Sequence, residues 1–184
     1  MRIIAGKFRG KRLLTPEDDA IRPTADRVRE SIFDILSSRL GPNFDGLRVL
    51  DLFAGTGALG LEALSRGASG AVLVETGAEA RGLVRDNIEA LGVAGIAKLL
   101  RRDATALGPC GTMGAFDLIF LDPPYNQGLG ERALVSAREG GWIAPDAMII
   151  FEEAREAAVT LPEGFVLEDR REYGAAAVHI VTLG

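Results

Sequence analysis

Cysteine and histidine are almost absent from the sequence, and this limits the chemistry that the chain can perform. Cys110 is the only cysteine and His179 the only histidine among 184 residues. A single thiol excludes an intramolecular disulfide and a thiolate metal cluster, and a single imidazole argues against a histidine-based metal site. We therefore expect no metal, and we expect the chemistry to depend on carboxylates, backbone groups and a cofactor.

Long apolar runs are also missing. No stretch reaches the ~18 apolar residues of a membrane span. The N-terminus, Met1-Arg-Ile-Ile-Ala-Gly-Lys7, is followed by charged residues and does not resemble a signal peptide. We therefore expect a cytoplasmic protein without a membrane segment. The length of 184 residues predicts a single domain over 1–184, with an N-terminal arm at 1–22 and an α/β core at 23–184, acting as a monomer.

Positive charge is concentrated near the N-terminus. The formal net charge of −5 argues against a general nucleic-acid coat. The basic residues that we predict to contact RNA are Arg2, Lys7, Arg9, Lys11, Arg12, Arg22, Arg27 and Arg29. A basic arm on an acidic body favours local contact with phosphates, and a merely solvated hairpin is the alternative. Two short apolar pieces separated by Gly6 and Gly10 predict that this arm is a small β-hairpin.

Strand-like and helix-like segments alternate along the rest of the chain. The predicted helices are at about 25–39, 58–66, 78–91 and 129–138. The predicted strands are at 49–53, 71–75, 98–101, 116–121 and 147–152, with a paired tail at 166–172 and 176–183. Repeated strand–helix units predict an α/β fold with a mostly parallel sheet, helices on both faces and an antiparallel end.

The segment Phe116-Asp-Leu-Ile-Phe-Leu-Asp-Pro-Pro-Tyr125 joins a buried strand to an abrupt polar end. Pro123 and Pro124 lack backbone N–H groups, and each restricts the residue before it to extended geometry. The strand end thus presents the Asp122 carboxylate, a free carbonyl and the Tyr125 ring together. This combination suits a flat base with an exocyclic amine, because the ring stacks and the acceptors bind the amine hydrogens. The alternative is that Pro-Pro only ends the strand.

The loop Gly55-Thr-Gly-Ala-Leu-Gly60 follows a strand and precedes a helix, as in nucleotide-binding Rossmann folds. Glu75 ends the next strand, where it can bind a ribose diol. Asp51 ends the strand before the loop, where its charge would repel a pyrophosphate and favour an ammonium or sulfonium group. Asp103, after the third strand, can accept a hydrogen bond from an adenine amine.

S-adenosylmethionine has an ammonium, a sulfonium, a ribose diol and an adenine, so it is the cofactor that we predict. The residues predicted to bind it are Asp51, Phe53, Ala54, Gly55, Thr56, Gly57, Glu75, Asp103 and Ala104. One alternative is an NAD-binding Rossmann oxidoreductase, which is opposed by Asp51 and the 122–125 segment. Another is a non-catalytic RNA-binding module on a degenerate fold, which is opposed by the intact glycine loop.

Two segments resemble the class I S-adenosylmethionine-dependent methyltransferases that act on exocyclic base amines: 49–64, Val-Leu-Asp-Leu-Phe-Ala-Gly-Thr-Gly-Ala-Leu-Gly-Leu-Glu-Ala-Leu, and Leu121-Asp-Pro-Pro-Tyr. Three more are similar to the RsmD-type 16S rRNA guanine-N2 methyltransferases of bacteria: Arg2-Ile-Ile-Ala-Gly with Gly10-Lys-Arg-Leu, Arg22-Pro-Thr-Ala-Asp-Arg-Val-Arg-Glu-Ser-Ile-Phe, and Tyr173-Gly174. The resemblance implies a Rossmann-like methyltransferase with a seven-stranded sheet and an N-terminal hairpin.

The resemblance also implies a reaction and a substrate. A methyl group would pass from S-adenosylmethionine to the N2 amine of a guanine in 16S rRNA or in a small ribosomal subunit particle. Asp122 and the Pro123 carbonyl would orient the amine, Pro124 would stiffen the strand end, and Tyr125 would stack on the base. An adenine N6 amine in DNA is the alternative target, although the small size and the N-terminal segments favour RNA.

Overall fold

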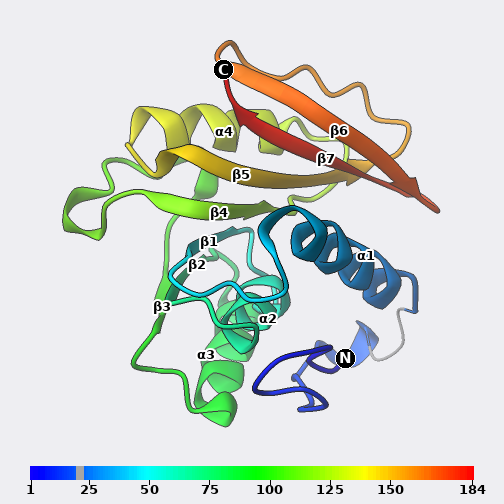
Figure 1. Cartoon of the computed structure of the whole chain (residues 1–184), viewed down its shortest axis with the longest axis vertical. Coiled ribbons are helices and arrows are strands. Elements are labelled where there is room, and N and C mark those ends of the chain that lie inside the picture. The colour runs from blue at the N-terminus through cyan, green and yellow to red at the C-terminus, as the bar shows by residue number, and fades with distance from the viewer. Residues whose placement is uncertain (20–22) are drawn as a thin grey trace.

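A seven-stranded sheet organises the computed structural model, which describes residues 1–19 and 23–184. The strand order is β3-β2-β1-β4-β5-β7-β6 (Figure 1). Strands β1 to β5 pair in parallel, whereas β7 is antiparallel to both β5 and β6. The strands are β1 Arg48–Leu52, β2 Gly70–Val74, β3 Ala97–Leu100, β4 Phe116–Leu121, β5 Ile143–Ala154, β6 Phe165–Tyr173 and β7 Ala176–Leu183.

Helices cover both faces of this sheet. The α-helices are α1 Pro23–Leu40, α2 Ala58–Ser65, α3 Ala78–Leu91 and α4 Leu129–Glu139, and the 3-10 helices are η1 Glu17–Asp19, η2 Ala104–Ala106 and η3 Gly111–Met113. Figure 1 shows α4 on one side of the sheet and α1, α2 and α3 on the other. Each side has its own buried apolar cluster, one with Phe120 and Ile150, the other with Leu121 and Phe151. The predicted parallel sheet with an antiparallel end is confirmed.

The fifth strand is longer than predicted. It runs from Ile143 to Ala154, whereas the sequence predicted 147–152. The extra residues at its end pair with the tail of the chain, where Glu153 lies opposite Ala177 and Ala154 opposite Ala176. A pairing with a strand this distant in the sequence leaves no local signal, so only the apolar centre of β5 was predictable.

The N-terminal segment folds back on itself without forming regular strands. Within residues 1–19 the structure contains an isolated antiparallel bridge between Arg2 and Arg12 and no strand. The Ile3 N–H donates to the Lys11 carbonyl at 2.9 Å. The predicted β-hairpin is therefore reduced to a turned-back loop, and we refer to residues 1–14 as the N-terminal loop. Ile3 and Leu13 are buried in the same apolar cluster as α1 and α2, so the loop is part of the core.

A buried carboxylate anchors the N-terminal loop to α2. Glu62 is fully buried and accepts the backbone N–H groups of Ile4 at 2.8 Å and Ala5 at 3.0 Å. Its charge is balanced by Arg66, whose Nε lies 3.1 Å away, and by Arg29, whose Nη1 lies 3.6 Å away. Because a buried charge is tolerated only when it is paired, this network fixes the loop firmly on the helix.

Close backbone contact reinforces the same docking. The Lys7 N–H donates to the Ser65 carbonyl at 2.7 Å. Gly6 has a φ of +85°, and a Cβ atom there would lie 2.0 Å from the Ser65 carbonyl oxygen. Only glycine combines that left-handed conformation with so close an approach.

No helix among the described residues is long and apolar enough to cross a membrane.

Glu62→Gln is expected to lower the free energy of unfolding by about 3–5 kcal/mol, the range for removing one partner of a buried ion pair. The variant removes the only ion-pair partner of Arg66 among the described residues and leaves the buried Arg29 with Asp26 alone. Urea denaturation of the variant against the wild type measures the effect. Glu79→Gln, an exposed glutamate of α3, is the matched control. Equal losses in the two variants would show that the Glu62 network does not stabilise the fold.

Candidate active site at the carboxyl ends of the strands

Three acidic residues lie at or near the carboxyl ends of neighbouring strands, on the same face of the sheet. In the strand register Asp51 of β1 lies beside Phe120 of β4, and Phe120 lies beside Ile150 of β5. Asp122 and Glu152 come two residues further along β4 and β5. Because side chains alternate between the faces of a strand, all three carboxylates lie on the side covered by α1, α2 and α3.

Asp51 is the most deeply buried of these acids, with 1% of its surface exposed. Its Oδ2 accepts the Gly60 N–H at 2.9 Å, and a Cβ atom on Gly60 would lie 3.1 Å from that oxygen. The pKa of Asp51 is raised from 3.8 to about 8. Burial is the main cause, the Gly60 hydrogen bond opposes it, and the charge of Glu75 adds to it. A cationic group placed beside Asp51 would stabilise its ionised form.

The predicted glycine loop directly follows Asp51 and Leu52. Phe53 has a φ of 58°, a left-handed conformation that is strained for a bulky residue and that occurs often at functional sites. Ala54 is tied to β2, because its N–H donates to the Val74 carbonyl at 3.0 Å. The space above Gly55 is open, since a Cβ atom there would meet nothing within 4 Å.

Glu75 at the end of β2 is held against this loop. Its Oε2 accepts the Gly55 N–H at 3.1 Å, and its Oε1 accepts the Gly77 N–H at 3.2 Å. The structure thus brings Glu75 together with the loop that contains Thr56 and Gly57, as the 20-residue spacing predicted. A ribose bound here would find a carboxylate and backbone groups side by side.

Asp103 follows β3, the strand that lies beside β2 in the sheet. Its Oδ1 accepts the Thr105 N–H at 2.8 Å and the Thr105 hydroxyl at 2.7 Å, and these bonds lower the pKa of Asp103. The carboxylate is exposed and ionised at neutral pH, whereas Ala104 behind it is buried. An ionised carboxylate at this point can accept a hydrogen bond from an amine.

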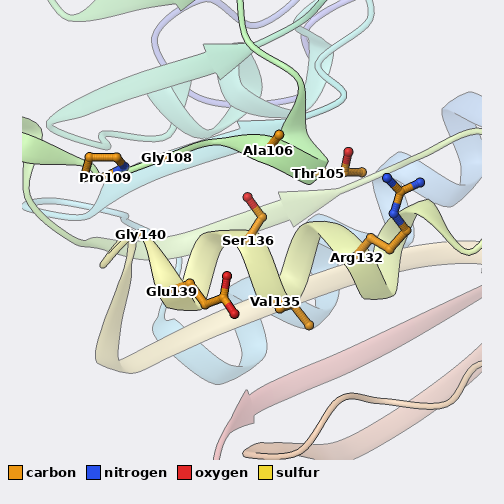
Figure 2. Close-up of a pocket in the computed structure, with 9 residues that line it drawn as sticks. All are labelled: Thr105, Ala106, Gly108, Pro109, Arg132, Val135, Ser136, Glu139 and Gly140. Atoms are coloured by element: carbon orange, nitrogen blue, oxygen red, sulfur yellow. The ribbon is translucent and has the colours of Figure 1, made fainter.

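An open groove lies beside Asp103 but on the other face of the sheet. It has a volume of about 510 Å³, and Figure 2 shows Arg132 and Ser136 of α4 pointing toward the 105–109 segment. The groove is lined by Thr105, Ala106, Gly108, Pro109, Arg132, Val135, Ser136, Glu139 and Gly140. None of the strand-end acids lines it, so the acids, and not this groove, mark the candidate site.

The end of β4 presents the acid and the aromatic ring as predicted. Asp122 is partly buried, Pro123 is buried and Pro124 is exposed. Burial raises the pKa of Asp122 well above its ordinary value, and the charges of Glu152, Asp51 and Glu153 raise it further. Tyr125 is 37% exposed. An exposed ring next to a carboxylate of raised pKa offers a stacking surface and a proton acceptor in one place.

Two functional candidates on β5 were missed by the sequence reasoning. Glu152 accepts a hydrogen bond from the Tyr125 hydroxyl, and burial raises its pKa. Glu153 is buried and accepts the N–H groups of Asn126 at 2.9 Å and Ala154 at 2.8 Å. Glu152 follows an apolar run in the same way as Asp51 and Asp122, so a signal was present. It was overlooked because no proline or glycine motif accompanies it.

Asn87 of α3 is a third missed residue, and it connects two parts of the site. It is fully buried, and its Nδ2 donates to the Thr56 carbonyl at 2.9 Å and to the Leu14 carbonyl at 3.1 Å. Its Oδ1 accepts the Leu14 N–H at 2.7 Å. The N-terminal loop and the glycine loop are therefore joined through one side chain. Nothing in the local sequence of a helix predicts such a role.

Most of the predicted RNA-contacting residues are exposed. They are Arg2, Lys7, Arg9, Lys11, Arg12 and Arg27, whereas Arg22 lies outside the described residues. The prediction for Arg29 is wrong, because this residue is only 5% exposed. Its guanidinium donates to the Arg2 carbonyl at 2.7 Å and pairs with Glu62. Arg29 thus stabilises the N-terminal loop from within, where a phosphate has no access.

This architecture defines the class of protein. A Rossmann-like, mostly parallel seven-stranded sheet with a glycine loop after β1 and an Asp-Pro-Pro-Tyr end on β4 is a class I methyltransferase fold. The structure named "Putative methyltransferase yhhF from Escherichia coli" superposes with a TM-score of 0.83 at 36% identity. The match covers 100% of this chain and 97% of that one.

The particular family follows from the sequence comparison. The profile of the family described as conserved hypothetical protein 95 matches residues 1–182, and the chain belongs to this family of RsmD-type methyltransferases. It is 37% identical to ribosomal RNA small subunit methyltransferase D of Escherichia coli K12, over 98% of this chain and 88% of the relative. It is 40% identical to the Bacillus subtilis protein named "Putative rRNA methyltransferase YlbH", over 98% and 97%.

No group of three or more His, Cys, Asp or Glu side chains suited to a metal ion occurs within residues 1–19 and 23–184. The burial of Asp51 has a consequence for the stability of the protein, because the folded state resists ionisation of this carboxyl group while the unfolded chain does not.

Asp51→Asn is expected to reduce the loss of stability as the pH rises. Because the pKa of Asp51 is about 8 in the folded protein and 3.8 ordinarily, the folded state keeps a proton that the unfolded chain releases. The free energy of unfolding therefore falls from pH 3.8 upward until about pH 8. Asparagine cannot ionise and still accepts the Gly60 N–H. Between pH 5 and 7 the variant should lose less stability than the wild type, by roughly 1–3 kcal/mol.

Urea denaturation of both proteins at several pH values measures this difference. Asp146→Asn, at an exposed aspartate of β5, is the control and should follow the wild type. Parallel curves for wild type and Asp51→Asn would mean that Asp51 ionises normally despite its burial.

Proposed function

We propose that this protein transfers a methyl group from S-adenosylmethionine to the exocyclic N2 amine of a guanine in 16S rRNA. The observation that carries the proposal is the Asp122-Pro-Pro-Tyr125 end of β4, which lies beside Asp51 and the glycine loop in a member of the RsmD-type family. Relatives named ribosomal RNA small subunit methyltransferase D support an rRNA substrate. An rRNA substrate also supports the cytoplasm as the compartment.

The residues present fit the cofactor. Asp51 is a buried carboxylate whose charge is unfavourable until a cation lies beside it, which suits the ammonium or sulfonium of S-adenosylmethionine. Glu75 would bind the ribose hydroxyls, and Asp103 would accept from the adenine amine. The open space above Gly55 would let the ligand approach the backbone of the loop. When bound, S-adenosylmethionine supplies an electrophilic methyl group at its sulfonium.

The end of β4 would prepare the base for attack. An exocyclic amine is a weak nucleophile, because its lone pair is delocalised into the ring. The Asp122 carboxylate and the Pro123 carbonyl would accept the two amine hydrogens and aim the lone pair at the methyl group, so that orientation provides most of the effect. Tyr125 would stack on the base after it leaves its RNA loop. Asp122, with its raised pKa, would receive the released proton or pass it to water.

The exposed basic residues of the N-terminal loop would bind RNA phosphates beside this site. Lys7, Arg9, Lys11 and Arg12 lie on a loop that is fixed to α2 through Glu62 and joined to the glycine loop through Asn87. Contacts of this kind hold the substrate in position and do not read its sequence. The choice of nucleotide would then depend on the shape of the RNA and on the base pocket.

Asp122→Ala is expected to abolish most of the methyl transfer while leaving cofactor binding intact. The single-turnover rate on 16S rRNA particles should fall by roughly 10²–10⁴, the range for a positioned acid–base group. The glycine loop and Asp51 are unchanged in this variant, so calorimetry should still detect S-adenosylmethionine binding. Asp146→Ala, at an exposed position, is the control.

Mass spectrometry of 16S rRNA from cells without the gene, complemented with wild type or Asp122→Ala, tests the function itself. The wild type should restore N2-methylguanosine at one mapped position, and the variant should not. Restoration of a methylated adenine in DNA instead would refute the proposed substrate. A near wild-type rate for Asp122→Ala would refute the role of this residue and leave the strand end as architecture only.

Replacing Lys7, Arg9, Lys11 and Arg12 together by Gln is expected to weaken RNA binding and to flatten its salt dependence. Each lost phosphate contact should reduce the slope of log K against log salt by roughly 0.7–0.9, so four substitutions reduce it by about 2–4. Filter binding of 16S rRNA at several salt concentrations measures the slope. Lys98→Gln, at an exposed lysine of β3, should leave it unchanged. An unchanged slope in the fourfold variant would show that the loop is only a solvated surface.

A further inference from the structure

We infer that Glu152 is a specificity-determining residue that accepts the N1–H of the target guanine, next to the amine bound by Asp122. This inference rests on the proposed function and extends it. The Asp-Pro-Pro-Tyr end of β4 suits exocyclic amines in general. A second acceptor from Glu152 would make the site select guanine among the bases that carry such an amine. The selecting group comes from β5, outside the Asp-Pro-Pro-Tyr segment of β4.

The first support is the position of Glu152. Leu121 of β4 pairs with Phe151 of β5, so Asp122, directly after β4, and Glu152, within β5, come next to each other on the same face of the sheet. Neighbouring strands are ~4.8 Å apart. The charge of Glu152 is the largest of the three neighbouring charges that raise the pKa of Asp122, which agrees with this short separation.

The second support is the chemistry of the base. The Watson–Crick edge of guanine has two adjacent donors, the N1–H and the N2 amine, and RNA-binding proteins read flipped bases along this edge. Two adjacent carboxylates match two adjacent donors. Adenine has an amine next to the N1 lone pair, and an acceptor opposite that lone pair would be repelled. A second carboxylate beside Asp122 therefore favours guanine over adenine.

The third support is the way in which Glu152 is held. Its Oε1 accepts the hydroxyl of Tyr125, which leaves the other oxygen without a hydrogen bond to the described residues. The same bond fixes the ring of Tyr125, on which the base would stack. Glu153 fixes the following backbone by accepting the Asn126 N–H at 2.9 Å. The stacking ring and the carboxylate are thus positioned together before the base enters.

The test compares guanine with 2-aminopurine at the mapped target position, in 16S rRNA assembled from ligated pieces. 2-Aminopurine keeps the N2 amine and lacks the N1–H. For the wild type we expect single-turnover methylation of the guanine substrate to be faster. For Glu152→Gln we expect the preference for guanine to shrink by about 10- to 100-fold, the effect of one hydrogen bond to a charged group. Differences in amine reactivity between the two bases cancel when the two ratios are compared.

Two variants separate base reading from other roles. Glu156→Gln, whose side chain is 90% exposed, should retain the wild-type preference. Tyr125→Phe removes the hydroxyl that holds Glu152 but keeps the carboxylate, so it should reduce the preference less than Glu152→Gln does. An unchanged preference in Glu152→Gln would overturn the inference, as would a preference lost equally in Tyr125→Phe. A wild type without methylation of either RNA would instead refute the proposed function.

Discussion

Like charges meet at one edge of the sheet, and the candidate site depends on this repulsion. Parallel strands end on the same side, so Asp51 of β1, Asp122 after β4 and Glu152 of β5 come together near the carboxyl ends of these strands. Burial raises the pKa values of Asp51, Asp122 and Glu152, and the charges of neighbouring carboxylates raise them further. Such an arrangement destabilises the protein alone and is relieved by a cation and by hydrogen-bond donors. In the proposed function, a sulfonium cofactor and an amine-bearing base would supply both.

Much of the site could be predicted from the sequence because its residues lie in local motifs. Asp51, Gly55 and Glu75 occupy fixed positions relative to a strand and a glycine turn, and Asp122 directly precedes two prolines. In each motif a strand is followed by glycines or prolines that restrict the backbone to a turn or an extended form. The parallel sheet then brings the ends of these strands together. The fold class followed from the alternation of strands and helices in the same way.

The parts that could not be predicted depend on contacts between distant segments. Arg29 has the same charge as the exposed arginines near it, and only the packing of α1 against Glu62 shows that it is buried. Asn87 has no local signal, because its partners Leu14 and Thr56 are 73 and 31 residues away. The apolar pieces and the basic charge likewise predicted a small hairpin arm, and no local signal showed that Ile3 and Leu13 are part of the core.

The docking of the N-terminal loop affects how the proposed RNA-binding surface would operate. A flexible arm would pay an entropic cost on binding, whereas this loop is already ordered by Glu62, Ser65 and Asn87. Its basic side chains therefore have fixed positions relative to the glycine loop, through the Asn87 bonds to Leu14 and Thr56. An RNA held by its phosphates on this loop would have a defined approach to the strand ends. Backbone recognition and base recognition would thus be linked by the protein's core, with the base itself read by Asp122 and Glu152 as proposed above.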